Sequence, residues 1–324
     1  MITEHQLAFK KGKIGGPQVA AALGLSPFQT PAGLAMELLG RAKPPEENAT
    51  IRGGNIMKPA IAELYTNQTG KEIWPWEDTC VHNQFLWLIS HPDYFINDPS
   101  ADESGDVDAD TLIEIKNVGS RQRFRWENGV PLHVVAQCVL LSMLTGVDKV
   151  EVVAYFGGAD LEIYPLKITD KQREQLLTKV CLFWFDWIAK NQIPPVCDRD
   201  IELIKTLYST SDNETELTAT PAVMEDIEDY RTFKKQRNEI DRSVGTLEAK
   251  IRLVMGGTSA LNNPDGTREF TYKQARKSRK TDWKAVGTEF LCHNEKLYND
   301  AVKKYTTVKK GSRQFVDKYN YDKE

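Results

Sequence analysis

The order of helical and strand patterns predicts a mixed α/β fold with a mainly helical C-terminal extension. Short segments with strand composition alternate with helical patterns up to residue 195, and a long helical periodicity follows. Apolar residues make up 40% and charged residues 27% of 324 residues, which is typical of a soluble globular protein. We expect a mixed central sheet flanked by helices in residues 1–198, and an arm in residues 199–324.

The N-terminal part begins with helical patterns. Pro17 and Pro31 suit the first turn of a helix, whereas Gly24, Gly40 and Gly70 are typical stop signals. The expected helices cover residues 17–24, 31–40 and 57–69.

Strand composition dominates the middle of this domain. The expected strands are 71–77, 85–90, 93–97, 111–118, 149–157 and 161–168. A helix over 131–146 interrupts them, and a long amphipathic helix over 169–192 stops before Pro194 and Pro195. This succession of helices, a group of strands, a helix, two strands and a helix predicts a mixed α/β layer arrangement.

The arm begins with one long helix over residues 221–255, whose apolar residues recur at three- to four-residue spacing. Because Lys234 and Arg237 interrupt this stripe, a helix packed on the arm or on the body is favoured over a long coiled coil. A Pro-Asp-Gly turn predicts a hairpin over 262–274. Helices are expected over 281–290 and 293–304.

Charge is distributed unevenly. Residues 268–313 contain thirteen Lys or Arg and five acids, a local balance of +8 in a chain of net charge −4. Such a basic region suggests a polyanionic partner, although a solvated helical surface has the same composition. No apolar run approaches a membrane span, and no secretory leader pattern is found at the N-terminus. Five cysteines without a CxxC motif favour reduced thiols and a cytoplasmic location over a zinc or CxxC-anchored iron–sulfur site.

The segment TLIEIKNV, residues 111–118, raises a chemical question. Side chains alternate across a strand, so Glu114 and Lys116 share one face while Ile113 and Ile115 share the other. Asp93 can approach from the neighbouring strand. Two carboxylates and a backbone carbonyl form a hard oxygen site suited to Mg²⁺ or Mn²⁺, and a lysine beside it can orient a metal-bound water. The pattern therefore suggests phosphodiester hydrolysis, although Glu-x-Lys on a strand is more often a solvated pair.

Several segments in order resemble one family. IGGPQVAAALGLSPFQTP (14–31), RGGNIMKPAIAELYTNQTGKEI (52–73), HPD (91–93), LIEIKNVGSR (112–121) and AQCVLLSMLTG (136–146) are similar to motifs of the YqaJ-type phage recombination exonucleases. These include lambda exonuclease and belong to the PD-(D/E)XK nuclease superfamily. The resemblance spans residues 14–195 and implies a PD-(D/E)XK nuclease core. The arm also resembles the tail of longer phage members.

The resemblance implies a role for each matching position. Asp93 and Glu114 would hold the metal, with the Ile115 carbonyl beside them; Lys116 would act on the attacking water, and Gln137 would support the site. Arg121 would contact a DNA phosphate, and Lys58 and Arg52 are further candidates for DNA contact. The implied activity is a Mg²⁺- or Mn²⁺-dependent exonuclease that degrades double-stranded DNA ends from 5′ to 3′. Candidate partners are double-stranded DNA, a single-strand annealing protein and further copies of the chain. Binding to a membrane is not expected.

Two positions depart from the family pattern. Pro17 replaces a serine, and no hydroxyl is available there for a 5′-phosphate. Lys58 replaces a helix glutamate beside the metal and water site. Three explanations stay open: two carboxylates suffice, the chain is a weakened or inactive relative, or another acid is recruited. The candidate acids are Asp98, Asp102, Asp106, Asp108 and Asp110.

Two classes of function follow. The first is the DNA exonuclease, favoured by Asp93, Glu114, Lys116 and Gln137. The second is a catalytically weakened DNA-binding or interaction protein that keeps the nuclease fold, favoured by Lys58. An endonuclease or repair nuclease of the same superfamily is a third reading.

Overall fold

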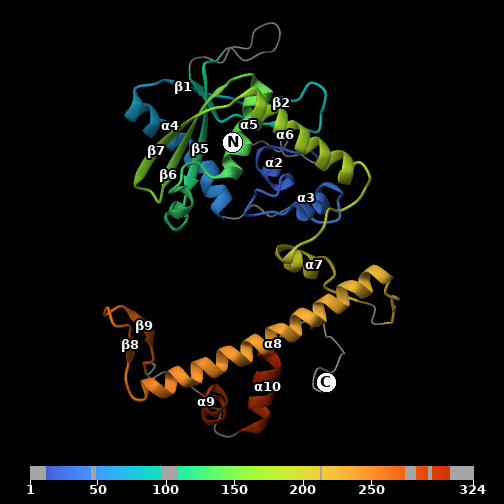
Figure 1. Ribbon diagram of the computed structural model, residues 1–324, viewed down its shortest axis with the longest axis vertical. Coiled ribbons are helices and arrows are strands. Elements are labelled where there is room, and N and C mark those ends of the chain that lie inside the picture. Colours follow the sequence, from blue (N-terminus) through green and yellow to red (C-terminus); the bar gives the residue numbers. More distant parts are fainter. Residues whose placement is uncertain are drawn as a thin grey trace. The chain divides into compact units, whose positions relative to one another are not determined.

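The structure is a computed structural model that describes residues 12–44, 49–96, 109–211, 214–273, 282–290 and 294–306 (Figure 1). Asp98, Asp102, Asp106 and Asp108, and parts of the basic stretch 268–313, lie outside these residues. The chain divides into two compact units, Met1–Tyr208 and Ser209–Glu324. The expected division lies earlier, at 198/199. Because the observed division follows Tyr208, the short helices η3 (Asp198–Asp200) and α7 (Ile201–Leu207) belong to the first unit.

The first unit is built on a five-stranded mixed sheet of order β1-β4-β5-β6-β7. Its strands are β1 (Ile73–Pro75), β4 (Tyr94–Ile96), β5 (Thr111–Val118), β6 (Lys149–Phe156) and β7 (Asp160–Lys167). Only the β5–β6 pair is parallel, because α5 (Leu132–Thr145) connects these two strands. A separate short pair joins β2 (Cys80–Val81) to β3 (Ile89–Ser90). The predicted mixed sheet flanked by helices is confirmed.

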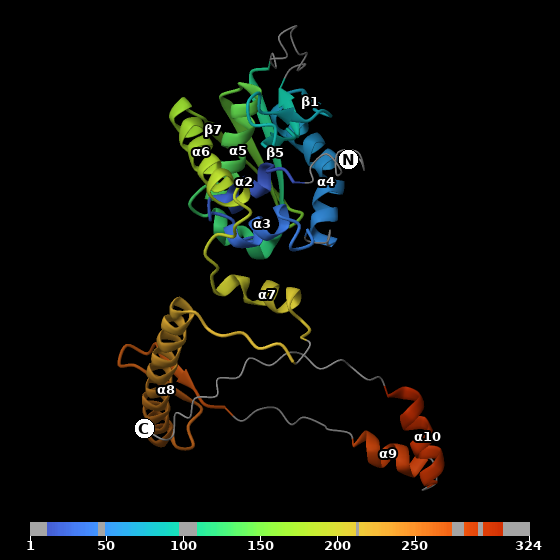
Figure 2. The same ribbon diagram turned by 90° about the vertical axis from the view of Figure 1, so that its right-hand side faces the viewer.

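Helices cover both faces of this sheet (Figure 2). On one face, α4 (Ala49–Thr69) buries Ile61 and Tyr65 against Ile113 and Ile115 of β5. On the other lie α2 (Gly16–Ala22), α5 and α6 (Asp170–Phe183), with α3 (Pro31–Leu38) beside α2. The two layers place the middle of β5 between α4 and α5.

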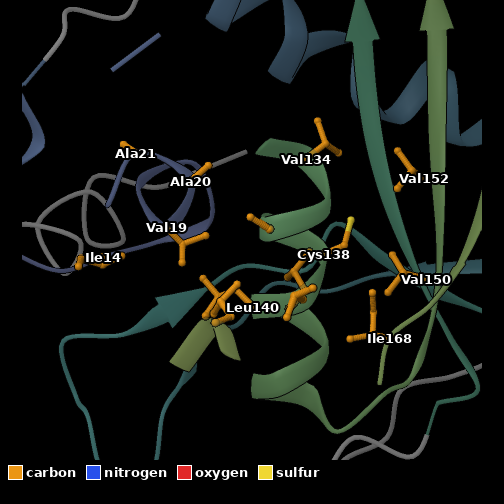
Figure 3. Close-up of a cluster of buried hydrophobic side chains, with 14 of the residues drawn as sticks. Ile14, Val19, Ala20, Ala21, Val134, Cys138, Leu140, Val150, Val152 and Ile168 are labelled. Carbon is orange, nitrogen blue, oxygen red and sulfur yellow. The ribbon is translucent and has the colours of Figure 1, made fainter. Parts of the chain in front are cut away.

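Small residues bring α2 close to α5. Ala20 and Ala21 of α2 are buried in the same cluster as Val134, Cys138 and Leu140 of α5 (Figure 3). Close packing removes apolar surface from water without leaving voids, and it fixes the position of α5 over the sheet.

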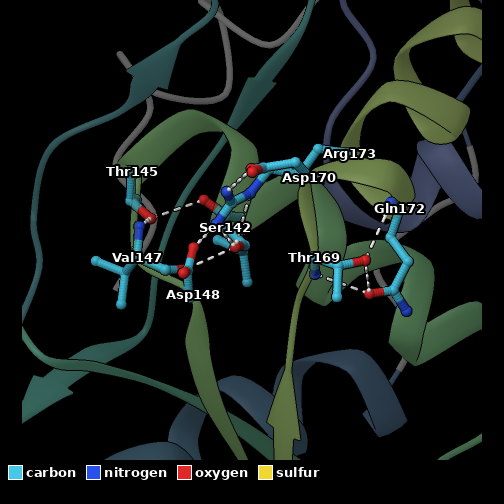
Figure 4. Close-up of polar contacts among 9 residues, drawn as sticks. Ser142, Thr145, Val147, Asp148, Thr169, Asp170, Gln172 and Arg173 are labelled. Carbon is cyan, nitrogen blue, oxygen red and sulfur yellow. Dashed lines mark hydrogen bonds and ion pairs between the residues drawn. The ribbon is translucent and has the colours of Figure 1, made fainter.

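Polar contacts fix the turn between α5 and β6 (Figure 4). Gly146 ends α5 with φ of 76°, a left-handed conformation that favours glycine. The Ser142 hydroxyl donates to the Val147 carbonyl at 2.6 Å, and Arg173 of α6 donates to Ser142 at 2.8 Å and pairs with Asp148. These bonds hold the start of β6 in register beside β5.

Several elements differ from the predictions. Helix α4 begins at Ala49 rather than at 57, although Gly53 and Gly54 each cost about 1 kcal/mol relative to alanine inside a helix. Only residues 89–90 of the expected strand 85–90 form a strand. The segment after β5 forms an unpredicted 3₁₀ helix, η1 (Ser120–Trp126).

The second unit contains the long helix α8 (Pro221–Met255), the hairpin β8 (Ala260–Asn262) and β9 (Arg268–Thr271), and helices α9 (Trp283–Phe290) and α10 (Glu295–Tyr305). These elements were expected. Most of the apolar stripe on α8 is exposed, including Ile240, Val244 and Leu247. None of the described helices is long and apolar enough to cross a membrane.

Candidate active site

The two faces of β5 carry different chemistry, as its alternation predicts. Ile113 and Ile115 pack under α4, whereas Leu112 belongs to the core on the α5 side. Glu114 and Lys116 point to that same α5 side, and Glu114 is only 1% exposed. The strand therefore buries a carboxylate where an apolar side chain would be the ordinary choice.

Glu114, Lys116 and Gln137 form a closed triangle of contacts. The Lys116 ammonium donates to Glu114 Oε1 at 2.6 Å and to Gln137 Oε1 at 2.8 Å. The Gln137 amide donates to the same Glu114 oxygen at 2.7 Å. A Cβ at Gly16 would lie 2.9 Å from Gln137 Cγ, so glycine in α2 leaves the room that Gln137 occupies. The predicted catalytic trio is thus assembled in space.

Asp93 enters the site from the start of β4, whose antiparallel pairing sets Tyr94 opposite Ile113. Its Oδ2 accepts a hydrogen bond from the Ile115 amide at 3.0 Å. Its Oδ1 pairs with the Lys58 ammonium, which reaches it from α4. Lys58, the residue that departs from the family pattern, therefore faces the site and neutralises one of its acids.

The electrostatics of the site follow from burial and close charges. Burial and the charge of Asp93 raise the pKa of Glu114, and the two lysines only partly offset this. Burial lowers the pKa of Lys58, but the charges of Asp93 and Glu114 outweigh it, so the net shift is upward. The site thus holds two acids and two ammonium groups.

One oxygen of Glu114 fits a metal ligand. Glu114 Oε2 is buried and has no hydrogen-bond partner among the described residues. A bare buried carboxylate oxygen is costly in a folded protein, and it is the hard ligand that Mg²⁺ and Mn²⁺ prefer. In the described ranges, no group of three or more His, Cys, Asp or Glu residues could hold a metal ion. Asp93 and Glu114 are the two acids that the structure brings together here, and metal binding by them with the Ile115 carbonyl stays a prediction.

The alternative third acid is not found at Asp110. This residue is exposed and precedes β5, four residues from Glu114, which is roughly 13 Å along a strand. The other four candidate acids lie outside the described residues.

The predicted DNA-contacting arginines are both exposed. Arg121 lies in η1, directly after β5, and Arg52 lies in the first turns of α4. Neighbouring Arg123 pairs with Asp160 and Glu162 of β7, which ties η1 to the sheet edge. Contact of Arg121 and Arg52 with DNA phosphates therefore stays a prediction.

Two residues near this site were not singled out from the sequence. His133 lies one turn before Gln137 on α5, and its ring contacts Phe28 with centroids 5.8 Å apart. The four-residue spacing of His133 and Gln137 is the signal that could have indicated a shared helix face.

A mixed sheet with a buried Glu-x-Lys strand, an aspartate on the adjacent strand and a supporting crossover helix is the arrangement that the PD-(D/E)XK resemblance implied. Residues 6–148 match the family model of the YqaJ-like viral recombinase domain. The match covers the N-terminal part of the chain, including Asp93, Glu114, Lys116 and Gln137.

Solved structures with similarity include the alkaline exonuclease LHK-Exo from Laribacter hongkongensis, at 19% identity and a TM-score of 0.46, over 63% of this chain and 97% of that chain. Its complex with dAMP gives 18% identity and a TM-score of 0.47 over the same shares, 63% and 97%. A phage-related exonuclease from Haemophilus somnus 129PT gives 10% identity and a TM-score of 0.38, over 53% of this chain and 91% of that chain. No curated protein sequence matches the chain.

Proposed function

We propose that the chain is a metal-dependent deoxyribonuclease that degrades double-stranded DNA ends from 5′ to 3′ and leaves 3′ single strands for phage-type recombination. The observation that carries this proposal is the buried Glu114 carboxylate, in which one oxygen is bare and the other contacts the Lys116 ammonium. The YqaJ-like viral recombinase domain over residues 6–148 supports the same class of activity.

In this proposal Asp93, Glu114 and the Ile115 carbonyl hold Mg²⁺ or Mn²⁺. When bound, the ion supplies an activated water and offsets charge on the phosphate. Lys116 holds its ammonium 2.6 Å from Glu114, where it can orient the attacking water or stabilise negative charge on the phosphate oxygens. Gln137 contacts both side chains and keeps the ammonium in place.

Arg121 and Arg52 would contact DNA phosphates, since both are exposed and cationic. The basic stretch 268–313 would add affinity that does not depend on sequence. A single-strand annealing protein and further copies of the chain are the other proposed partners.

A second candidate function rests on one observation, the ion pair of Lys58 with Asp93. An ammonium that already neutralises a metal-binding carboxylate competes with the metal, so the chain would bind DNA ends while cutting slowly or not at all.

One experiment separates the two candidates. A duplex labelled at either its 5′ or its 3′ end is incubated with the chain in Mg²⁺, in Mn²⁺ and in EDTA. The nuclease proposal expects metal-dependent release of nucleotides, with loss of the 5′ label first, and no release by Glu114→Gln. Binding of the duplex without cleavage in either metal would instead support the weakened nuclease.

A further inference from the structure

Exposed apolar side chains occur at the start of α5 and in the segments before α3 and α5. Phe28, in the turn between α2 and α3, is 80% exposed. Phe124 of η1 and Leu132 of α5 are 61% and 67% exposed. A single exposed apolar side chain needs no explanation, but an exposed ring held rigidly beside a reaction centre does.

The turn that carries Phe28 is fixed from both sides. The Ser26 hydroxyl is buried and accepts a hydrogen bond from the Phe28 amide at 3.2 Å. Arg199 donates to the Ser26 carbonyl at 3.0 Å, and Thr30 donates to the buried Asp200 carboxylate. The ring is therefore presented to solvent by a backbone with little freedom, so ordering it on a ligand costs little entropy.

A ring contact and the spacing of residues on α5 connect Phe28 to the candidate active site. Its ring meets His133 edge to face, with centroids 5.8 Å apart and an interplanar angle of 84°. His133 and Gln137 lie one turn apart on the same face of α5, and Gln137 contacts Lys116. Burial lowers the pKa of His133, and the charges of Lys116 and Arg125 lower it further.

The combination of a free aromatic face with flanking cations matches one ligand chemistry. Nucleobases stack on aromatic faces regardless of sequence, while cations contact the phosphates between them. Arg125 lies over the Phe124 ring, 5.6 Å from its centroid, so a cation and an exposed apolar ring lie together in η1. A face of a base inside an intact duplex is covered by its neighbours, and only an end or unpaired nucleotide offers one.

We propose that Phe28, supported by His133, is a stacking subsite for the base of a terminal or unpaired nucleotide next to the reaction centre, with Arg125 for its phosphate. The subsite rests on the proposed function and names the part of the DNA that is held there. It adds affinity for an end nucleotide that does not depend on which base is present.

Binding of the full chain to fluorescent duplexes in EDTA tests the subsite without any cleavage. Two duplexes are compared, one with a normal 5′-terminal nucleotide and one with an abasic residue at that position. Stacking of one base predicts that the wild type prefers the normal end by about tenfold. Phe28→Ala should lose this preference, and Phe28→Trp should keep it. Phe233→Ala, which removes a comparably exposed ring from α8, should leave it unchanged.

A preference that persists in Phe28→Ala overturns the subsite, as does equal binding of both ends by the wild type, while either result leaves the proposed nuclease function standing. Absence of binding by the wild type to either duplex overturns both. Circular dichroism of Phe28→Ala should match the wild type, because the removed ring is mostly exposed.

Discussion

The two acids of the site lie in contrasting surroundings. Both oxygens of Asp93 have partners, the Lys58 ammonium and the Ile115 amide. Glu114 is more deeply buried, yet Lys116 and Gln137 share one of its oxygens and the other has no partner among the described residues. The sequence motif presents the two carboxylates as equivalent ligands, but their surroundings in the structure are different.

Asp93 has hydrogen-bond partners for both oxygens, whereas burial of an unpartnered oxygen of Glu114 costs folding free energy. An aspartate with an ion pair and an amide donor is stable without a metal, whereas a bare buried carboxylate oxygen weakens the fold unless a ligand reaches it. Glu114 is therefore the better marker of function, and Asp93 is the residue whose metal binding has a competitor.

Glu114→Gln should have the largest effect on activity. It removes a metal ligand, and we expect the cleavage rate to fall by at least about a thousandfold. In EDTA the same change should raise Tm by about 3 °C, the shift expected for about 1 kcal/mol in a domain of this size, because a neutral amide is cheaper to bury. Labelled-duplex rates and circular dichroism melts measure the two effects.

Asp93→Asn is the matched comparison within this test. It should also abolish cleavage, but it should lower Tm, because it removes the charge that pairs with Lys58. Glu63→Gln on an exposed position of α4 should change neither quantity. A lower Tm for Glu114→Gln would contradict the contrast between the two acids.

Lys116→Ala should have the next largest effect. The ammonium lies between Glu114 and Gln137, and losing a positioned cation should slow cleavage by about a hundredfold. Binding of duplex DNA in EDTA should change little, because the expected role is in the reaction. Lys149→Ala, at the exposed start of β6, is the control. Cleavage at the wild-type rate would show that Lys116 is only a structural partner of Glu114.

Local periodicity was enough to predict one part of this site. Alternation along β5 correctly placed Glu114 and Lys116 opposite Ile113 and Ile115, because the period of two is a property of the strand itself. This alternation could not show which oxygen of Glu114 stays without a partner, because that depends on the hydrogen bond from Gln137, in another element, to Oε1. The contact of Phe28 with His133 was equally hidden, because it joins distant parts of the sequence.

The prediction of elements failed where side-chain packing decides the backbone. Residues 85–88 have strand composition, but Phe85 and Trp87 instead pack on aromatic residues after α6, with Trp87 stacked on Trp184 at 4.3 Å. Composition reports that a segment is apolar and does not report which neighbour it packs against.

Lys58→Glu tests whether the Lys58 ammonium competes with a metal ion for Asp93. The change restores an oxygen ligand and removes the ammonium that pairs with Asp93, so half-maximal cleavage should need about tenfold less Mg²⁺. Lys58→Met removes the charge alone and should give a smaller shift in the same direction. Calorimetric titration with Mn²⁺ provides a readout without cleavage. If Lys58 contacts DNA phosphate instead, both variants should bind duplex more weakly and cut more slowly.

The smallest expected effect lies in the second unit and concerns binding alone. Lys303 and Lys304 are exposed in the last turn of α10 and belong to the basic stretch. Changing both to Gln should weaken duplex binding a few-fold, because phosphate contacts are lost. Each lost contact should also reduce the slope of log affinity against log salt by about 0.9. Cleavage at saturating DNA should not change, since neither residue is part of the site around Glu114. Anisotropy titrations from low to high salt measure the slope, with Glu295→Gln on the same helix as the control. An unchanged slope would assign this helix to protein contacts and limit phosphate binding to the other basic residues.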